Sequence, residues 1–113
     1  MPGSFRTDDA HGEDYAPVRA AILKEYVFQE AKNLVDDLPG WRLIRADEEA
    51  KVLVCERKGG LLAGDSQIEI RCEGPEGLPS CTVEVESTST TGLRSRDRAN
   101  VAEFVRPFRR RIC

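Results

Sequence analysis

Two segments of this 113-residue chain alternate apolar and polar side chains with a period of two residues. They are residues 66–73 (SQIEIRCE) and residues 81–90 (CTVEVESTST), in which isoleucine, valine and cysteine fall on one side. Successive side chains of a strand point to opposite faces of its sheet. The alternation therefore predicts antiparallel strands with one face packed on a core and the other in water, so the covered face needs helices.

The apolar residues in the C-terminal part of the chain have the spacing of an α-helix. Apolar residues recur there at spacings of three and four: Val101, Phe104, Val105, Phe108 and Ile112. This spacing predicts an amphipathic helix that begins near Asp97. We expect Pro107 to kink this helix or to end its regular part, because a proline ring blocks the backbone hydrogen bond to the carbonyl of Glu103.

The remaining residues supply another helix and two more strands. Pro17 precedes an apolar stripe at helical spacing, and the Pro-Gly pair at 39–40 ends it. Residues 41–47 and 51–57 are rich in apolar and β-branched residues and predict two strands. The order α-β-β-β-β-α predicts an α+β two-layer sandwich, in which a four-stranded antiparallel sheet carries the N- and C-terminal helices on one face.

Length and charge set the domain organisation that we expect. Residues 1–14 are polar and acidic and predict a flexible leader, whereas residues 15–113 have the size of a single domain. No long apolar run that could span a membrane and no secretory signal is present, so we expect a cytoplasmic protein. The net charge is −3, yet residues 94–113 carry seven arginines and two acids. The acidic remainder would repel nucleic acid, which we do not expect as a partner.

The titratable residues predict neither catalysis nor a metal site. The four cysteines lack any CxxC spacing, and the single histidine, His11, lies in the acidic leader. A cysteine nucleophile would lack an imidazole partner, and no paired carboxylates or GxSxG motif occur. We therefore expect no enzyme, no cofactor and no metal, with the cysteines serving as buried thiols.

The junction between the last strand and the last helix has the ingredients of an anion site. Its hydroxyl groups, its glycine and its arginines lead into a helix N-terminus, where free N–H groups favour an anion. The candidate residues are Ser87, Ser89, Gly92, Arg94, Ser95 and Arg96. The competing interpretation is structural: Asp97 would cap the helix and place its own carboxylate where an anion would bind, while the arginines pair with the acidic body.

The glycine-rich loop before residue 66 predicts a hairpin connection and no phosphate site. Gly59 and Gly64 have the spacing of a phosphate-binding loop, but Asp65 stands where that loop carries lysine. Leu61 and Leu62 lie at the tip. Either they fold back over the core, or they form the entrance to a pocket for an apolar ligand between sheet and helices.

Residues 28 to 112 resemble a family of small, mostly bacterial proteins known as a domain of unknown function, numbered fourteen ninety-nine. The segments LPGWRLIRADEE and VEVESTSTTG carry the resemblance. The matching positions at the strand-to-helix junction are Ser87, Ser89, Gly92, Asp97 and Asn100, whereas Thr90 stands where the family has arginine. The resemblance implies the same order of elements and names no ligand.

Taken together, these patterns predict a non-enzymatic binding or interaction module. Its partner would be a protein or a small anion, held at the corner formed by residues 87–97. The alternative is a carrier of a small apolar ligand, with Leu61 and Leu62 at the entrance. The sequence leaves the oligomeric state open.

Overall fold

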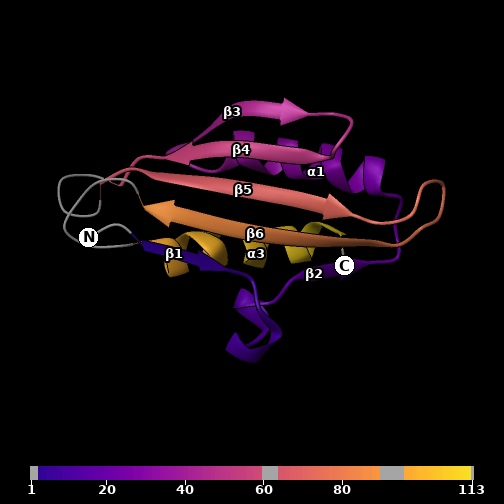
Figure 1. Cartoon of the computed structure of the whole chain (residues 1–113), viewed down its shortest axis with the longest axis horizontal. Coiled ribbons are helices and arrows are strands. Elements are labelled where there is room, and N and C mark those ends of the chain that lie inside the picture. The colour runs from indigo at the N-terminus through magenta and orange to yellow at the C-terminus, as the bar shows by residue number, and fades with distance from the viewer. Residues whose placement is uncertain (1–2, 60–63, 90–95, 113) are drawn as a thin grey trace.

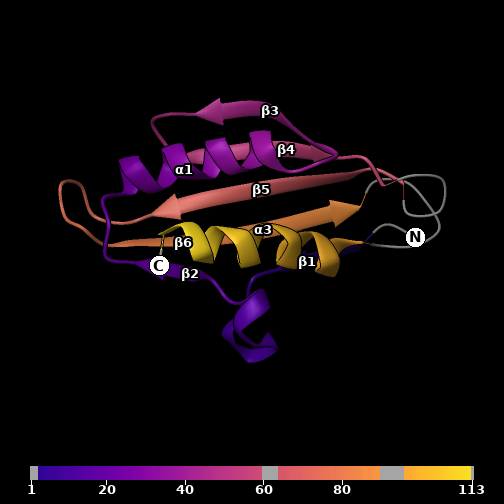
Figure 2. The ribbon, with the colours of Figure 1, turned by 180° about the vertical axis from the view of Figure 1, so that it is seen from behind.

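The computed structural model describes residues 3–59, 64–89 and 96–112, which form an antiparallel sheet covered by two helices. The strands are β1 (Gly3–Arg6), β2 (Val18–Ala20), β3 (Trp41–Asp47), β4 (Val52–Arg57), β5 (Ser66–Glu73) and β6 (Cys81–Ser89), and the helices are α1 (Lys24–Asp37) and α3 (Asp97–Ile112). The sheet order is β1-β6-β5-β4-β3, and β2 also pairs with β6 (Figure 1). Figure 2 shows both helices on the same face of the sheet. No helix of the described residues is long and apolar enough to cross a membrane.

The predicted α+β fold, its antiparallel sheet and its two helices are confirmed. The strand predicted over residues 41–47 has those bounds, and the alternating faces of β5 and β6 are buried and exposed as expected. The predicted number of strands was wrong, because the sheet has six strands and not four. The two additional strands come from the N-terminal residues.

Residues 3–20 differ most from the prediction. The expected flexible leader over residues 1–14 contains β1, which pairs with the end of β6 from Gly3↔Ser89 to Arg6↔Glu86. The helix expected from Pro17 begins at Lys24, because β2 occupies the preceding residues and Val18, paired with Val83, is fully buried. Proline suits an extended segment as well as a first helical turn, so Pro17 did not distinguish the two.

Strands β1 and β2 are two halves of one interrupted edge strand. Thr7 continues the ladder after β1, since its N–H donates to the Val85 carbonyl at 2.9 Å and its hydroxyl accepts from the Val85 N–H at 3.2 Å. Pairing resumes at Val18, opposite Val83. Between these points, residues 8–17 leave the sheet as a loop with two single-turn 3-10 helices, η1 (Asp9–His11) and η2 (Glu13–Tyr15), visible in Figures 1 and 2 below the sheet.

The apolar stripe of α3 fills the space between the helices and the sheet. Its five predicted core residues, Val101, Phe104, Val105, Phe108 and Ile112, are all buried. The rings of Phe104 and Phe108 lie with their centroids 4.9 Å apart. The helix continues through Pro107 to Ile112, so the proline does not end it.

Truncating the centre of this core should destabilise the fold strongly. Phe104→Ala is expected to lower the free energy of unfolding by about 3–5 kcal/mol, because it removes a fully buried ring and leaves a cavity. Urea denaturation followed by circular dichroism measures the change. Tyr26→Ala, at an exposed position of α1, is the control and should shift stability by only about 0.5 kcal/mol.

Candidate functional site

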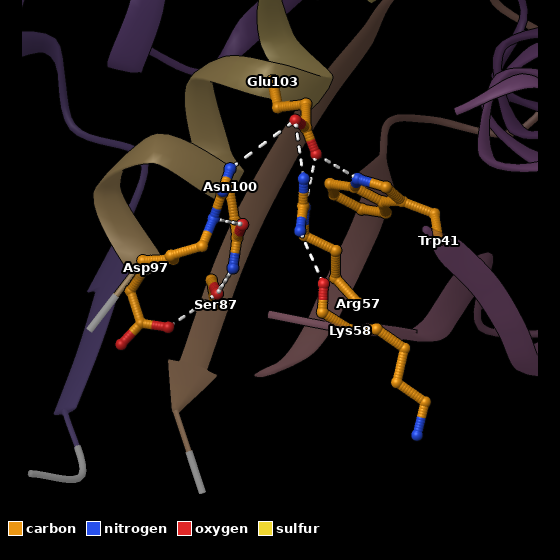
Figure 3. A network of polar contacts seen from close by, with 8 residues as sticks. Trp41, Arg57, Lys58, Ser87, Asp97, Asn100 and Glu103 are labelled. Carbon is orange, nitrogen blue, oxygen red and sulfur yellow. Dashed lines mark hydrogen bonds and ion pairs between the residues drawn. The ribbon is translucent and has the colours of Figure 1, made fainter. Parts of the chain in front are cut away.

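The strand-to-helix corner binds a carboxylate that belongs to the chain itself. The hydroxyl of Ser87 donates to Oδ1 of Asp97 at 2.8 Å (Figure 3). The hydroxyl of Ser89 donates to the same oxygen at 2.9 Å. All three side chains are buried. The inward face of β6 changes from valine to serine at the level where α3 begins, so the hydroxyls meet the first residue of the helix. Asp97 therefore takes up the hydrogen bonds that these two serines could offer to an external anion. The sequence interpretation expected this carboxylate to cap the helix and did not foresee its bonds to the serines.

Asn100 extends this contact into a buried network. Its side-chain amide donates from Nδ2 to Oγ of Ser87 at 3.1 Å, so the Ser87 hydroxyl both donates and accepts. Its Oδ1 accepts from Nε of Arg96 at 3.4 Å. Among the described residues, no buried side-chain nitrogen or oxygen lacks a hydrogen-bond partner. A satisfied network of this kind fixes the position of the helix on the sheet.

Glu103 is the second centre of the network and connects α3 to β3 and β4. Arg57 donates to its carboxylate from Nε at 2.7 Å and from Nη2 at 3.2 Å, and Trp41 donates from Nε1 (Figure 3). The Arg96 guanidinium lies 3.6 Å from the same carboxylate. Arg57 also donates from Nη1 to the carbonyl of Lys58 at 2.6 Å.

Burial opposes ionisation of Glu103, but its partners outweigh burial. The hydrogen bonds from Arg57 and Trp41, together with the charges of Arg57 and Arg96, hold the pKa of the Glu103 carboxyl below its ordinary value. The side chain is therefore an ionised anchor at neutral pH.

The structure accounts for three of the residues predicted to form the anion site. Ser87 and Ser89 bind Asp97, and Arg96 lies between Asn100 and Glu103. The predicted residues Gly92, Arg94 and Ser95, and the predicted ligand entrance Leu61 and Leu62, lie outside the described residues.

Sequence reasoning missed Trp41, Arg57 and Glu103 as members of the network. One signal was present: Asp97 and Glu103 are the two acids among the basic residues 94–113, and each is a centre of the network. An isolated acid in a basic helix that faces a sheet is a reason to look for a buried partner.

A pocket of about 350 Å³ lies on the open face of the sheet, opposite the helices. Its lining residues come from β3, β4 and the start of β5: Arg42, Ile44, Val54, Cys55, Glu56, Asp65, Ser66 and Gln67. The β3–β4 register shifts between Leu43 and Arg45, which is a bulge that adds one residue to β3. The extra residue is Ile44, which is half exposed beside Val54.

Charged groups surround this small apolar area. Arg42 pairs with Glu56 at 3.3 Å, and Lys58 lies 3.3 Å from both Glu56 and Asp65. Farther along the open face, Arg71 pairs with Glu69 and with Glu84. The pocket thus combines a small apolar area, formed by Ile44 and Val54, with a rim that carries both charges.

The three described thiols are buried, and the contact with Cys72 lowers the pKa of Cys81. Burial raises the pKa of Cys55 to about 12, and the contact with Cys81 together with burial raises the pKa of Cys72. His11, the single histidine of the chain, packs its ring 5.0 Å from that of Phe5 in the N-terminal loop. Within residues 3–59, 64–89 and 96–112, no group of three or more His, Cys, Asp or Glu side chains could hold a metal ion.

Comparison with solved structures finds chains that share the fold. The chain is similar to Ara h 8.0201, with a TM-score of 0.62, 11% identity, and coverage of 99% of this chain and 95% of that one. It is also similar to a norcoclaurine synthase point mutant from Thalictrum flavum in complex with a transition-state analogue, with a TM-score of 0.56, 12% identity, and coverage of 98% and 96%. No protein-family model and no curated protein sequence matches the chain. At these identities the likeness shows the fold alone, a helix-grip arrangement of a sheet around a C-terminal helix.

Removing the charge of Glu103 should cost stability in a pH-dependent way. Glu103→Gln is expected to lower the free energy of unfolding at pH 7 by roughly 1.5–3 kcal/mol, because Arg57 and Trp41 lose a charged acceptor. A carboxyl whose pKa is lowered on folding stabilises the protein above its unfolded pKa, and the stabilisation is lost as pH falls through the folded pKa. The difference between variant and wild type should therefore shrink below about pH 4.5, the ordinary value for this carboxyl.

Urea denaturation between pH 3 and pH 7 measures this difference. Glu48→Gln is the matched control, since Glu48 forms an exposed pair with Lys32, and should change stability by only about 0.5 kcal/mol. A Glu103→Gln effect that is equally large at both ends of this pH range would contradict an ionised anchor.

Proposed function

We propose that the protein binds a small amphipathic molecule without catalysis, and that the pocket on the open face of the sheet is the site. The pocket itself carries this proposal. Its volume of about 350 Å³ falls at the lower end of the range of about 300–1,000 Å³ that is typical of small-molecule sites. Ile44 and Val54 provide its apolar surface, and polar groups converge on it from β3, β4 and β5.

The chemistry of the lining indicates the class of ligand. An apolar body would lie on Ile44 and Val54, where burying each CH₂ group contributes about 0.8 kcal/mol. A charged head group would reach the rim, where Arg42 is well exposed and Glu56 is less so. The bulge in β3 supports the assignment, because bulges re-aim side chains and occur often beside functional sites.

The proposed position differs from the carrier pocket expected between sheet and helices. In the described structure, fully buried side chains of α3 and of β4–β6 occupy that space, including Phe104, Phe108 and Leu53. The fold supports small-molecule binding in a general way, since a norcoclaurine synthase with the same fold is found in complex with a transition-state analogue. An anion at the strand-to-helix corner has less support, because Ser87 and Ser89 already bind Asp97.

The absence of catalysis is part of the proposal and rests on the thiols and the histidine. The raised pKa values of Cys55 and Cys72 leave those thiols protonated at neutral pH, and Cys81, whose pKa is lowered, is buried against Cys72. His11 packs on Phe5, in the loop that interrupts the edge strand at the other side of the sheet from β3. The pocket itself contains ion-paired carboxylates and no histidine.

We also propose that the chain belongs to the family of unknown function that its sequence resembles. Its support is that residues which carried the resemblance, namely Trp41, Ser87, Ser89, Asp97 and Asn100, are the ones joined with Glu103 in the polar network. Residues that hold the last helix on the sheet have a structural role. Proteins that share them can therefore have different ligand sites.

Octanoate and octylamine, which share an apolar body and differ in the head group, are suitable probes for the pocket. We expect one of them to bind and Ile44→Glu to weaken that binding at least tenfold, equivalent to about 1.4 kcal/mol, because a carboxylate replaces the apolar floor. Calorimetric titration measures the affinity. Leu78→Glu is the matched control: Leu78 is 58% exposed and Ile44 is 51% exposed, but only Ile44 lines the pocket.

Two outcomes would overturn the assignment. Equal loss of affinity in both variants would show that the probes bind through general charge or apolar surface elsewhere. Failure of the wild type to bind either probe would show that the pocket does not accept amphipathic molecules of this size.

A further inference from the structure

The loop of residues 8–17 lies against a row of arginines on α3. The arginine row consists of Arg98, Arg106 and Arg109, whose spacing places them on one side of the helix. This side belongs to the helix layer, whereas the proposed ligand pocket is on the open face of the sheet. Nothing in the proposed ligand binding uses either the loop or the row.

Each arginine of the row contacts one acidic-aromatic segment, Glu13-Asp14-Tyr15. The Arg98 guanidinium lies 4.5 Å from the Tyr15 ring centroid, within cation–π distance. Arg106 pairs with Asp14 at 2.9 Å. Arg109 donates to the Glu13 carbonyl at 3.0 Å and lies 3.9 Å from the Glu13 carboxylate.

These contacts are weak individually and therefore replaceable. The side chains of Glu13, Asp14 and Arg106 are 79%, 44% and 56% exposed, so water and salt screen their attraction. The short helices η1 and η2 contain no fully buried residue, and the strongest hold on the loop is Tyr15, which packs partly buried against the core with its ring centroid 5.7 Å from that of Phe5. The residues of β1 and β2 that pair with β6 lie on either side of the loop and do not belong to it.

The loop is also an insertion that sheet pairing does not require. Thr7 pairs with Val85 and Val18 pairs with Val83, so one residue opposite Glu84 would suffice to complete the edge strand. Ordered surface loops inserted in a rigid frame are frequent carriers of binding functions.

We propose that the arginine row is a docking surface for an acidic, tyrosine-containing peptide segment of a partner protein, which Glu13-Asp14-Tyr15 covers within the same chain. The partner segment would supply carboxylates to Arg106 and Arg109 and an aromatic ring to Arg98, as the loop does. The covering loop is tethered at both ends, so it competes at a high effective concentration. The partner segment can then dock only when the contacts between Glu13-Asp14-Tyr15 and the arginine row are weakened.

A labelled synthetic peptide with the sequence of residues 8–17, DDAHGEDYAP, is the probe, and fluorescence anisotropy at low ionic strength is the measurement. The double variant Glu13→Gln/Asp14→Asn weakens the cover and should bind the peptide at least tenfold more tightly than the wild-type chain does. Adding Arg106→Ala and Arg109→Ala to this variant should return binding to the wild-type level or below. Arg110→Ala is the matched control in the same turn, because Arg110 is exposed and outside the row, and should leave binding within about twofold.

Amide NMR shifts provide a second readout that does not depend on affinity. Addition of the peptide to the double variant should shift signals of residues 98–109 of α3, and circular dichroism confirms that each variant is folded. Equal affinity for the wild type and the double variant, an equal loss with Arg110→Ala, or shifts confined to other elements would overturn the proposal. Tighter binding of a single-stranded DNA oligonucleotide than of the peptide would also overturn it, by assigning the surface to nucleic acid.

Discussion

The bond that the rest of this structure depends on joins Asp97 to two serines of β6. Helix α3 supplies the largest part of the core, but its apolar stripe is useful only if the helix begins at the correct height on the sheet. Ser87 and Ser89 set that height, because they bind the carboxylate of its first residue. Asn100 and Glu103 follow at spacings of three, so the same side of the helix makes successive polar contacts with β6, β4 and β3.

This anchoring leaves the two proposed functional surfaces on the outside of the molecule. Phe104, Phe108 and the polar network occupy the interface between α3 and the sheet. The open face of the sheet has the pocket beside the β3 bulge, and the outer side of α3 has the arginine row beneath the N-terminal loop. The two proposals concern separate surfaces and can fail independently.

The sequence predicted those elements whose pattern repeats over several residues. The alternation in β5 and β6 and the helical period in α3 extend over eight residues or more, and each was placed correctly. Strands β1 and β2 have only four and three residues, too few for a period to show. They form because they pair with the edge of β6 that β5 leaves unpaired. The paired residues are more than sixty positions apart in the sequence, so local patterns do not reveal them.

The sequence likewise predicted part of the candidate site but not all of it. The inward direction of Ser87 and Ser89 followed from the alternation, and Asp97 was recognised as a group that competes with an external anion. The partners of Glu103 could not be found in this way, because Trp41 and Arg57 come from strands 62 and 46 residues away. The bulge that exposes Ile44 could not be predicted from the sequence either, because the register shift depends on how β3 pairs with β4.

The most direct test of the central claim, that Asp97 and the serines of β6 form an internal anchor, is a double-mutant cycle. The free energies of unfolding of Ser87→Ala, Asp97→Ala and the combined variant are compared with that of the wild type by urea denaturation. The account predicts a coupling energy of about 1–3 kcal/mol between the two positions. Effects that add to within about 0.5 kcal/mol would contradict it, because they would show that the serine hydroxyl and the carboxylate do not stabilise the fold through each other.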